Sequence, residues 1–340
     1  MSATLIVGPS WVGDMVMSQT LYIALKKANP DMHIDVLAPA WSEPLLAAMP
    51  EVRHAIRMPL GHGQFDLMAR RKLGKQLNSS AYNRAFVLPN SWKSALVPWF
   101  ADIPVRTGWR GEMRYGLLND LRLLDKERFP YMIQRYVALG NEQGDAPDDI
   151  AEISKPVLQI NEEILAPLYE KFSIVSKMAK LGLCPGAEFG PAKRWPETHY
   201  ATVAAARIDA GEQVLIFGSA NDEAVANNIV QALPEEKRAA CVNLAGKTSL
   251  NEAIHAMSLC DRFVTNDSGL MHIAAALGKP LVALYGSTSA GFTPPLGDND
   301  TALSIPVDCG PCFERECPLG HMKCLVELKP EKVLDVIGVC

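Results

Sequence analysis

The sequence lacks any long hydrophobic run. No stretch reaches the roughly 18 apolar residues of a membrane-spanning helix, although 48% of the 340 residues are hydrophobic. The apolar start, residues 1–7, stops at Gly8 and Pro9 and has no basic flank, so it does not resemble a secretory signal. We therefore expect a cytoplasmic protein without a membrane span.

The common phosphate-binding glycine motifs are absent as well. After the first expected strand, Gly8 and Gly13 stand five residues apart with Pro9 and Trp11 between them, which does not match G-x-G-x-x-G. A G-x-x-x-x-G-K-[ST] loop is also missing. These absences argue against an NAD-linked dehydrogenase and against a P-loop enzyme.

Cysteine is too scarce for a disulfide scaffold, with 8 residues in a chain of 340. Four of them cluster with the spacing C-x2-C-x4-C-x6-C, at Cys309, Cys312, Cys317 and Cys324, with His321 among them. A structural zinc loop, redox-sensitive thiols and reduced thiols in an irregular loop all remain open, because the second and third intervals are not common zinc spacings. The isolated Cys184, Cys241 and Cys260 are expected in the core.

The length and the residue pattern predict two α/β domains. Short apolar strands at about residues 5–7, 34–37 and 86–88 alternate with helices, and the alternation resumes at residues 180–184. Such alternation is typical of a parallel sheet covered on both faces. The glycine-rich and acidic texture of residues 140–165 indicates a linker, so we expect Rossmann-like, doubly wound domains at 1–165 and 166–328 and a C-terminal helix at 329–340.

The stretch 262–277 reads as a buried strand that turns sharply into a helix. Asn266, Asp267 and Ser268 are cap-type residues between the two elements. The first turn of such a helix leaves backbone N–H groups unpaired and carries about half a positive charge, so it suits a phosphate. His272 lies four residues after Ser268 and therefore on the same helical face, as a packed residue or as a phosphate contact.

Three other places where a strand is expected to end carry polar side chains. Asp14 begins a helix after the first strand, where it could cap that helix or accept a proton. Lys193 lies in a glycine- and proline-rich loop, which would suit a diphosphate. Asp222 and Glu223 open another helix, where a carboxylate could cap it or bind ribose hydroxyls.

The net charge is −5, yet residues 51–135 hold 15 Lys/Arg against 7 Asp/Glu. This basic segment includes a glycine-broken loop, residues 106–116, that mixes cations with aromatic side chains. A solvated face and an anionic ligand are both open interpretations. The net acidic chain and the lack of a known binding module argue against nucleic acid.

Taken together, four segments resemble the ADP-heptose:lipopolysaccharide heptosyltransferases, most closely the heptosyltransferase II branch. They are residues 8–15, 106–116, 184–196 and 265–272. The resemblance implies a GT-B fold, in which two Rossmann-like domains face a central cleft, and no cofactor. It implies inverting, metal-independent transfer of L-glycero-D-manno-heptose from ADP-heptose onto the first heptose of the lipopolysaccharide inner core. Asn266-Asp267 does not resemble a D-x-D metal-binding motif, which agrees with a metal-independent reaction.

The resemblance also assigns site residues. It implies Asp14 as the general base and Lys193 as the cation at the donor phosphates. The implied donor-binding residues are Asp222, Asp267, Ser268, Gly269, Leu270 and His272, and the choice between Asp222 and Glu223 for ribose stays open. The basic residues matched to the acceptor are Lys93, Arg106, Arg110 and Arg114.

The implied partners are ADP-heptose, an acceptor of the heptosyl-Kdo2-lipid A type and, peripherally, the inner face of the inner membrane, in the biogenesis of the Gram-negative outer membrane. Two alternatives remain open. One is a related glycosyltransferase with another acceptor or nucleotide sugar, and the other is a non-catalytic protein that binds a nucleotide sugar.

Overall fold

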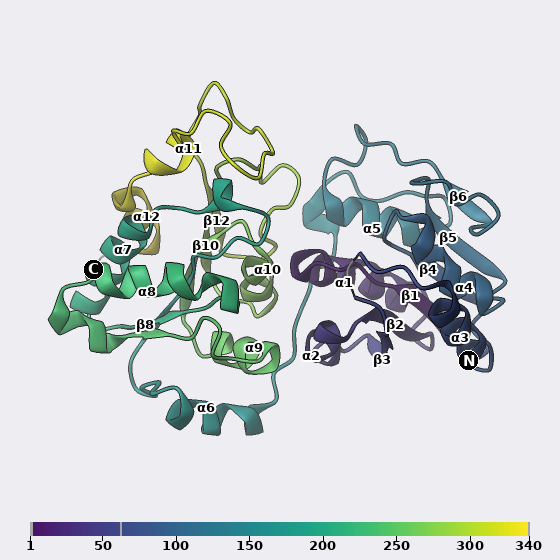
Figure 1. The fold of residues 1–340 in the computed structure, drawn as a ribbon, viewed down its shortest axis with the longest axis horizontal. Coiled ribbons are helices and arrows are strands. Elements are labelled where there is room, and N and C mark those ends of the chain that lie inside the picture. Colours follow the sequence, from purple (N-terminus) through teal and green to yellow (C-terminus); the bar gives the residue numbers. More distant parts are fainter. Residues whose placement is uncertain (1–2, 62, 339–340) are drawn as a thin grey trace. The chain divides into compact units, whose positions relative to one another are not determined.

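The computed structural model describes residues 3–61 and 63–338, and this part of the chain forms two compact units (Figure 1). The first unit ends at Leu158 and the second begins at Gln159. The boundary expected from the sequence, after residue 165, lies seven residues beyond this division. Residues 159–165 belong to the second unit, where the Asn161 N–H donates to Nε2 of His255 at 3.2 Å.

The first unit is built on a six-stranded parallel sheet with the order β3-β2-β1-β4-β5-β6. Its strands are β1 (Ala3–Val7), β2 (His33–Pro39), β3 (Val52–Met58), β4 (Arg84–Val87), β5 (Val105–Trp109) and β6 (Asp120–Arg122). All five residues of β1 are buried, as expected for a central strand covered on both faces. The strand order reverses between β1 and β4, so their carboxyl ends flank the crevice where doubly wound sheets bind ligands.

Among the described residues, four α-helices lie between successive strands of this sheet and a fifth follows β6. They are α1 (Val12–Ala28), α2 (Glu43–Ala47), α3 (Leu67–Asn78), α4 (Leu96–Phe100) and α5 (Met132–Gly140), with short 3-10 segments at Ala40–Ser42, Trp92–Ala95 and Ile150–Glu152. The carboxylate of Asp66 accepts the Ala69 N–H at 2.9 Å and so fixes the start of α3. Pro30 lies just past the end of α1, as the sequence predicts for a helix stop.

The second unit repeats the same layout. Its six-stranded parallel sheet has the order β12-β11-β10-β7-β8-β9. The strands are β7 (Lys180–Cys184), β8 (Gln213–Ile216), β9 (Cys241–Asn243), β10 (Arg262–Asn266), β11 (Leu281–Leu284) and β12 (Asp300–Leu303). Counted from the first strand of each unit, both sheets have the order 3-2-1-4-5-6, and here the reversal falls between β7 and β10.

Helices cover both faces of this second sheet (Figure 1). They are α6 (Leu165–Lys171), α7 (Glu197–Asp209), α8 (Glu223–Ala232), α9 (Leu250–Ser258), α10 (Gly269–Ala276), α11 (Lys323–Val326) and α12 (Pro330–Ile337), with 3-10 segments at Glu162–Ile164, Pro191–Lys193, Ala220–Asp222 and Glu235–Ala240. Val333 of α12 lies in the same core as Leu181 and Leu183 of β7. The expected C-terminal helix is therefore part of the second unit, and residues 339–340 lie outside the described residues.

The predicted α/β class is confirmed for each unit. Among the residues that the structure describes, no helix combines the length and the apolar character needed to cross a bilayer. Within each sheet the central parallel strands end at the same edge, and the predicted site residues Lys193, Asp267 and Ser268 follow the central strands of the second sheet.

Candidate active site

In the second unit, the loop after β7 and the turn after β10 lie side by side. The two strands pair in parallel, with Thr265 opposite Cys184, so both chains leave the sheet at the same edge. Asn266 joins the two segments, because its Nδ2 donates to the Pro185 carbonyl at 2.6 Å and its Oδ1 accepts the Trp195 N–H at 3.1 Å. Asn266 is fully buried. Its amide thus holds the loop to the turn, a role that its cap-type sequence context did not reveal.

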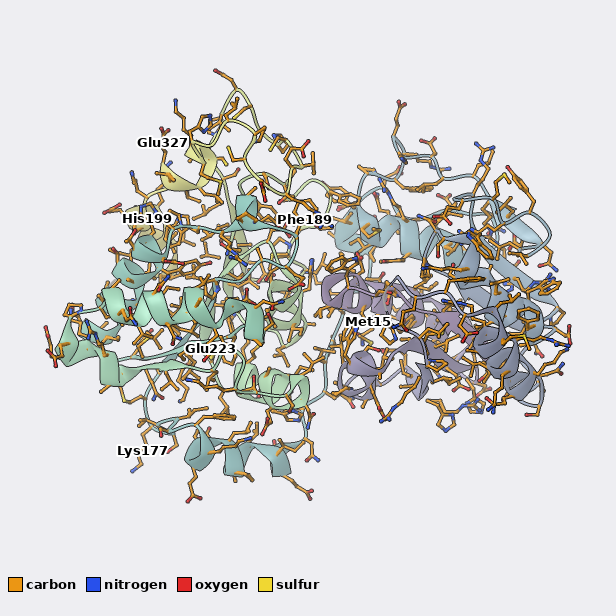
Figure 2. All side chains as sticks on the ribbon, viewed as in Figure 1. Met15, Lys177, Phe189, His199, Glu223 and Glu327 are labelled. Atoms are coloured by element: carbon orange, nitrogen blue, oxygen red, sulfur yellow. The ribbon has the colours of Figure 1, made fainter. Side chains whose placement is uncertain are left out.

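The predicted cation and a predicted acid meet at this edge. The Nζ atom of Lys193 lies 2.6 Å from Oδ2 of Asp267, and the hydroxyl of Thr288 donates to the same oxygen at 2.6 Å. Lys193 Nζ also lies 4.9 Å from the centre of the Phe189 ring, in the loop after β7 (Figure 2). The side chains of Lys193 and Asp267 are 13% and 5% exposed, so the ion pair is largely shielded from water. Lys193 is therefore held in one place and keeps N–H donors for a ligand.

The helix start beside this pair contains buried polar atoms without partners. Among the described residues, no hydrogen-bond partner is found for Ser268 Oγ, His272 Nδ1 or Ser287 Oγ. Ser268 is the N-cap of α10, and its side chain makes no capping bond. Buried polar atoms are nearly always paired, so the two orphans at the start of α10, Ser268 Oγ and His272 Nδ1, mark a place where a polar ligand would fit. Gly269 and Leu270 are half-buried in the first turn. Their backbone N–H groups have no carbonyl acceptor within the helix, because no turn precedes them.

Thr288 and Ser287 were missed by the sequence analysis. They follow β11, the neighbour of β10 in the sheet, and so reach the same edge as Asp267. The available signal was their position just past an apolar run, at residues 281–285. Serine and threonine are too common after strands for that position alone to mark a site.

His272 is neutral in the folded protein. Burial lowers its pKa from 6.5 to about 4, the Asp267 carboxylate opposes the shift, and the Lys193 cation adds to it. Protonated His272 thus disfavours the folded state, so stability is retained above about pH 6.5 and is lost as the pH falls towards about 4. The shift corresponds to about 3 kcal/mol.

We expect a smaller acid-induced loss of unfolding free energy in His272→Gln than in the wild type. Urea unfolding between about pH 7 and about pH 5 measures it. Equal acid slopes in wild type and His272→Gln would contradict the buried neutral imidazole.

Asp222 occupies the capping role that the sequence analysis left open. Its Oδ2 accepts the backbone N–H and the hydroxyl of Ser219 at 2.9 and 2.8 Å, and the residue is 7% exposed. A Cβ on Gly186 would lie 2.4 Å from the Asp222 carboxyl carbon, so the loop after β7 packs tightly on this carboxylate. Glu223, the first residue of α8 and labelled in Figure 2, is exposed. Of the two carboxylates, Glu223 is the one left open to solvent.

Asp14 belongs to the first unit. It is the third residue of α1, half-buried, in the first turn after the loop that follows β1. Burial and, to a smaller extent, the charge of Asp14 raise the pKa of Tyr136 on α5 well above its usual value. The carboxylate therefore lies near Tyr136, at the carboxyl edge of the first sheet.

Two of the four predicted acceptor residues are committed to the fold. Arg114 is 1% exposed and donates to the carbonyls of Pro89, at 2.6 Å, and Trp109. Burial lowers its pKa to about 10, so it keeps its charge at neutral pH while holding its loop to the one after β4. Arg106 donates to the Ile103 and Leu117 carbonyls, both at 2.6 Å. These internal bonds tie both guanidinium groups to the fold, and the expectation that they bind the acceptor stays a prediction.

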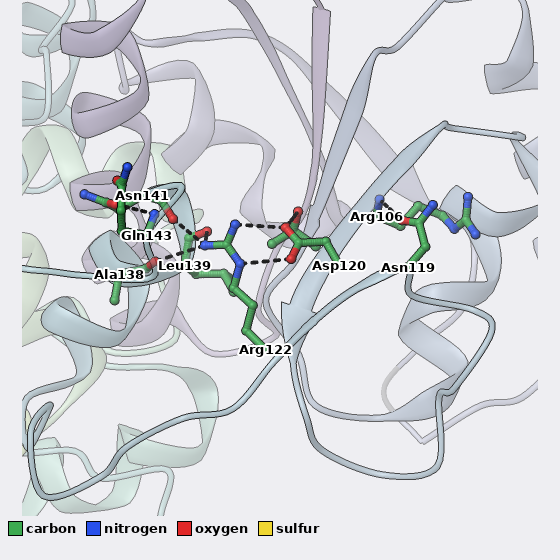
Figure 3. A network of polar contacts seen from close by, with 9 residues as sticks. Arg106, Asn119, Asp120, Arg122, Ala138, Leu139, Asn141 and Gln143 are labelled. Carbon is green, nitrogen blue, oxygen red and sulfur yellow. Dashed lines mark hydrogen bonds and ion pairs between the residues drawn. The ribbon is translucent and has the colours of Figure 1, made fainter.

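The edge of the first sheet is held by a polar network around Arg122 (Figure 3). Its guanidinium pairs with Asp120 at 2.8 Å and donates to the Leu139 carbonyl, at the end of α5, at 3.1 Å. The Arg106 N–H donates to Asn119 at 2.7 Å in the same view. This network anchors the loop between β5 and β6. Of the predicted acceptor cations, the exposed Arg110 and the half-buried Lys93 remain accessible.

Comparison with known proteins decides the family. Residues 70–323 match the profile of glycosyltransferase family 9 (heptosyltransferase). The chain belongs to this family. The prediction from the sequence motifs is thereby confirmed, and the protein is a glycosyltransferase.

Family 9 relatives match nearly the whole chain. It is 52% identical to lipopolysaccharide heptosyltransferase 2 of Escherichia coli (strain K12), covering 98% of this chain and 97% of the relative. It is 52% identical to lipooligosaccharide heptosyltransferase 2 of Haemophilus influenzae, with 98% of each covered. The solved structure of the E. coli ADP-heptose LPS heptosyltransferase II matches with a TM-score of 0.88 at 50% identity, over 99% of this chain and 97% of that one. The structural match confirms the predicted GT-B type of fold.

Proposed function

We propose that this family 9 glycosyltransferase transfers L-glycero-D-manno-heptose from ADP-heptose onto the first heptose of the lipopolysaccharide inner core. One observation carries the donor side: two orphan polar atoms, Ser268 Oγ and His272 Nδ1, lie at the start of α10, directly after Asp267, which pairs with Lys193. The sugar and the acceptor rest on the similarity to heptosyltransferases 2 along nearly the whole chain. The second unit is then the donor domain and the first the acceptor domain.

The donor domain stabilises the leaving diphosphate. As the bond between the anomeric carbon and the phosphate oxygen breaks, the electron pair leaves with ADP, and negative charge builds up on the diphosphate. Lys193 and the first-turn amides of α10 place positive charge there before the reaction begins. The hydroxyl of Ser268 and Nδ1 of the neutral His272 offer hydrogen bonds to the same group. Glu223 is the carboxylate that we assign to the ribose hydroxyls.

The acceptor domain supplies the base. The acceptor hydroxyl oxygen attacks the anomeric carbon from the side opposite the diphosphate, which inverts the configuration. Asp14 takes the hydroxyl proton as the new bond forms. Asp14 lies in the first turn of α1, where the helix dipole favours a negative charge. Lys93 and Arg110 are assigned to the anionic groups of the acceptor.

We further propose that the start of α3 rests on anionic lipid headgroups at the cytoplasmic face of the inner membrane. Phe65 and Met68 are 51% and 66% exposed, and the Phe65 ring lies 5.1 Å from that of Trp92. Arg71 and Lys72, one turn further along α3, are also exposed. Apolar side chains next to cations match the boundary between acyl chains and anionic headgroups.

We expect the double substitution Arg71→Gln/Lys72→Gln to weaken binding to vesicles containing anionic phospholipid by about 30-fold, since each cation contributes about 1 kcal/mol near such a surface. Co-sedimentation at low salt measures it. The matched control, Lys237→Gln/Arg238→Gln, removes two cations from the second unit. Unchanged binding by the α3 variant, or binding that salt does not weaken, would contradict this surface.

An acceptor assay tests the function as a whole. Mass spectrometry should detect one added heptose, with release of ADP, when ADP-heptose is supplied with a heptosyl-Kdo2-lipid A acceptor, and none when the acceptor lacks the first heptose. Transfer from another nucleotide sugar, or to another acceptor only, would favour the related-transferase alternative. Calorimetric binding of ADP-heptose without product from any acceptor would favour the non-catalytic alternative.

A further inference from the structure

The four clustered cysteines come together in the structure. They lie in the segment between β12 and α12, here called the thiol loop (residues 309–324). The side chains of Cys309, Cys312, Cys317 and Cys324, with that of His321, line a single cavity of about 20 Å³. Two residues of the donor region, Ala192 and Ser287, line the same cavity. The proposed transfer reaction gives these thiols no role.

The size and the lining of the cavity favour one soft metal ion. A volume of about 20 Å³ is close to the 10–15 Å³ that a single water needs, so it has room for one ion. Four thiols are the ligand set of structural zinc sites, which closes a tetrahedral shell without an open position. The first pair, Cys309 and Cys312, has the C-x2-C spacing of such sites.

The backbone of the thiol loop turns sharply between its cysteines. Phe313, Gly320 and Met322 have φ angles of 58°, 68° and 50°, which turn the chain after Cys312 and after Cys317. All four cysteines, before and after these turns, line the same cavity.

We propose that Cys309, Cys312, Cys317 and Cys324 bind one zinc ion as four thiolates. Among the described residues, no three His, Cys, Asp or Glu side chains are already grouped so that they could hold a metal ion. Ligation thus requires the four sulfur atoms to move closer together. Each thiol that binds releases its proton to solvent, so four protons leave as the ion enters.

Zinc at this position would hold in place the backbone of the thiol loop, which contacts the proposed donor site; this support is here called the brace. The Arg315 carbonyl accepts the Ala192 N–H at 3.0 Å, next to Lys193, and the Phe313 N–H donates to the Ser287 carbonyl at 2.7 Å, next to Thr288. Gly190 leaves no room for a side chain, since a Cβ there would lie 2.4 Å from the Arg315 carbonyl oxygen. Only this consequence rests on the proposed function; the zinc site does not.

Metal analysis of the full-length chain, purified without chelator under reducing conditions, tests the proposal. We expect about one zinc per chain in the wild type, and a loss of most of it in Cys312→Ser/Cys317→Ser. The control Cys260→Ala removes a buried thiol outside the loop and should keep the metal. Circular dichroism checks that each variant is folded. Replacement by cobalt should give the intense sulfur-to-metal absorption of a tetrahedral thiolate site.

A wild-type chain that binds less than about one tenth of an equivalent of zinc, even after titration with zinc, would overturn the proposal. So would iron bound in its place. Loss of zinc in His321→Ala together with its retention in Cys324→Ser would overturn the four-thiolate set. Since a double cysteine variant could fail to fold, release of zinc from the folded wild type by a mercurial thiol reagent gives a second test.

A separate measurement tests whether zinc supports the proposed donor site. Zinc-depleted protein should bind ADP more weakly in calorimetry and regain its affinity when zinc is restored. Unchanged ADP affinity after depletion would overturn the brace. Zinc binding without any heptose transfer would leave the metal site standing and reject the proposed function.

Discussion

Asp14→Asn is expected to lower heptose transfer about 10²- to 10⁴-fold, the usual contribution of a general base. The amide keeps the size of the carboxylate and its place in the first turn of α1 but cannot accept the acceptor proton. Because Asp14 lies in the first unit and the proposed donor site in the second, the affinity for ADP, measured by calorimetry, should stay within about twofold of wild type. The readouts are the rate of ADP release and the yield of product by mass spectrometry.

The matched control is Asp31→Asn, an exposed aspartate beyond the far end of the same helix. It should leave transfer unchanged. Turnover by Asp14→Asn within a few-fold of wild type would remove Asp14 as the base. Loss of ADP binding in that variant would instead point to damage beyond the acceptor domain.

Lys193→Ala is expected to lower kcat/KM for ADP-heptose about 10²- to 10³-fold, as found when a donor to a developing negative charge is removed. Binding of ADP should weaken as well. The substitution also leaves Asp267 buried without its cation, and breaking a buried pair costs about 3–5 kcal/mol of stability. The activity loss alone therefore does not separate catalysis from folding.

A second variant separates the two effects. Lys193→Ala/Asp267→Asn removes the unpaired charge and should regain most of the lost stability, measured by urea unfolding, but not the activity. The control Lys237→Ala breaks an ion pair of the same length, 2.6 Å to Asp209, whose carboxylate is 62% exposed, and should cost no more than about 1 kcal/mol. If the double variant regains transfer, Lys193 is a structural residue only.

The central strands of both sheets could be predicted from the sequence because they are buried on both faces. Leu5-Ile6-Val7 and Arg262–Asn266 appear as apolar runs that end in cap-type or turn residues. The edge strands β6 and β12 could not be predicted. The three residues Asp120–Arg122 are all half-buried and two of them are charged, so only pairing with β5 makes them a strand.

Candidate site residues could be predicted where a polar or charged residue directly follows an apolar strand. Asp267 and Ser268 belong to this group, and the structure brings Lys193 to Asp267 across 74 residues of sequence. Whether a long cationic side chain is buried in the fold or exposed to solvent could not be predicted. Arg114 and Arg110 look alike in the sequence, yet Arg114 is buried by a loop whose path depends on contacts with Pro89 and Trp109.

Hydrogen exchange with and without ADP tests most directly where the nucleotide binds. The two units share one strand order, so each offers an equivalent crevice, and the account assigns ADP to the second. ADP should slow exchange at the backbone amides of residues 186–194 and 267–271 and leave residues 8–14 and 89–93 unchanged. Protection confined to residues 8–14 and 89–93 would contradict the assignment of the donor to Lys193 and the start of α10.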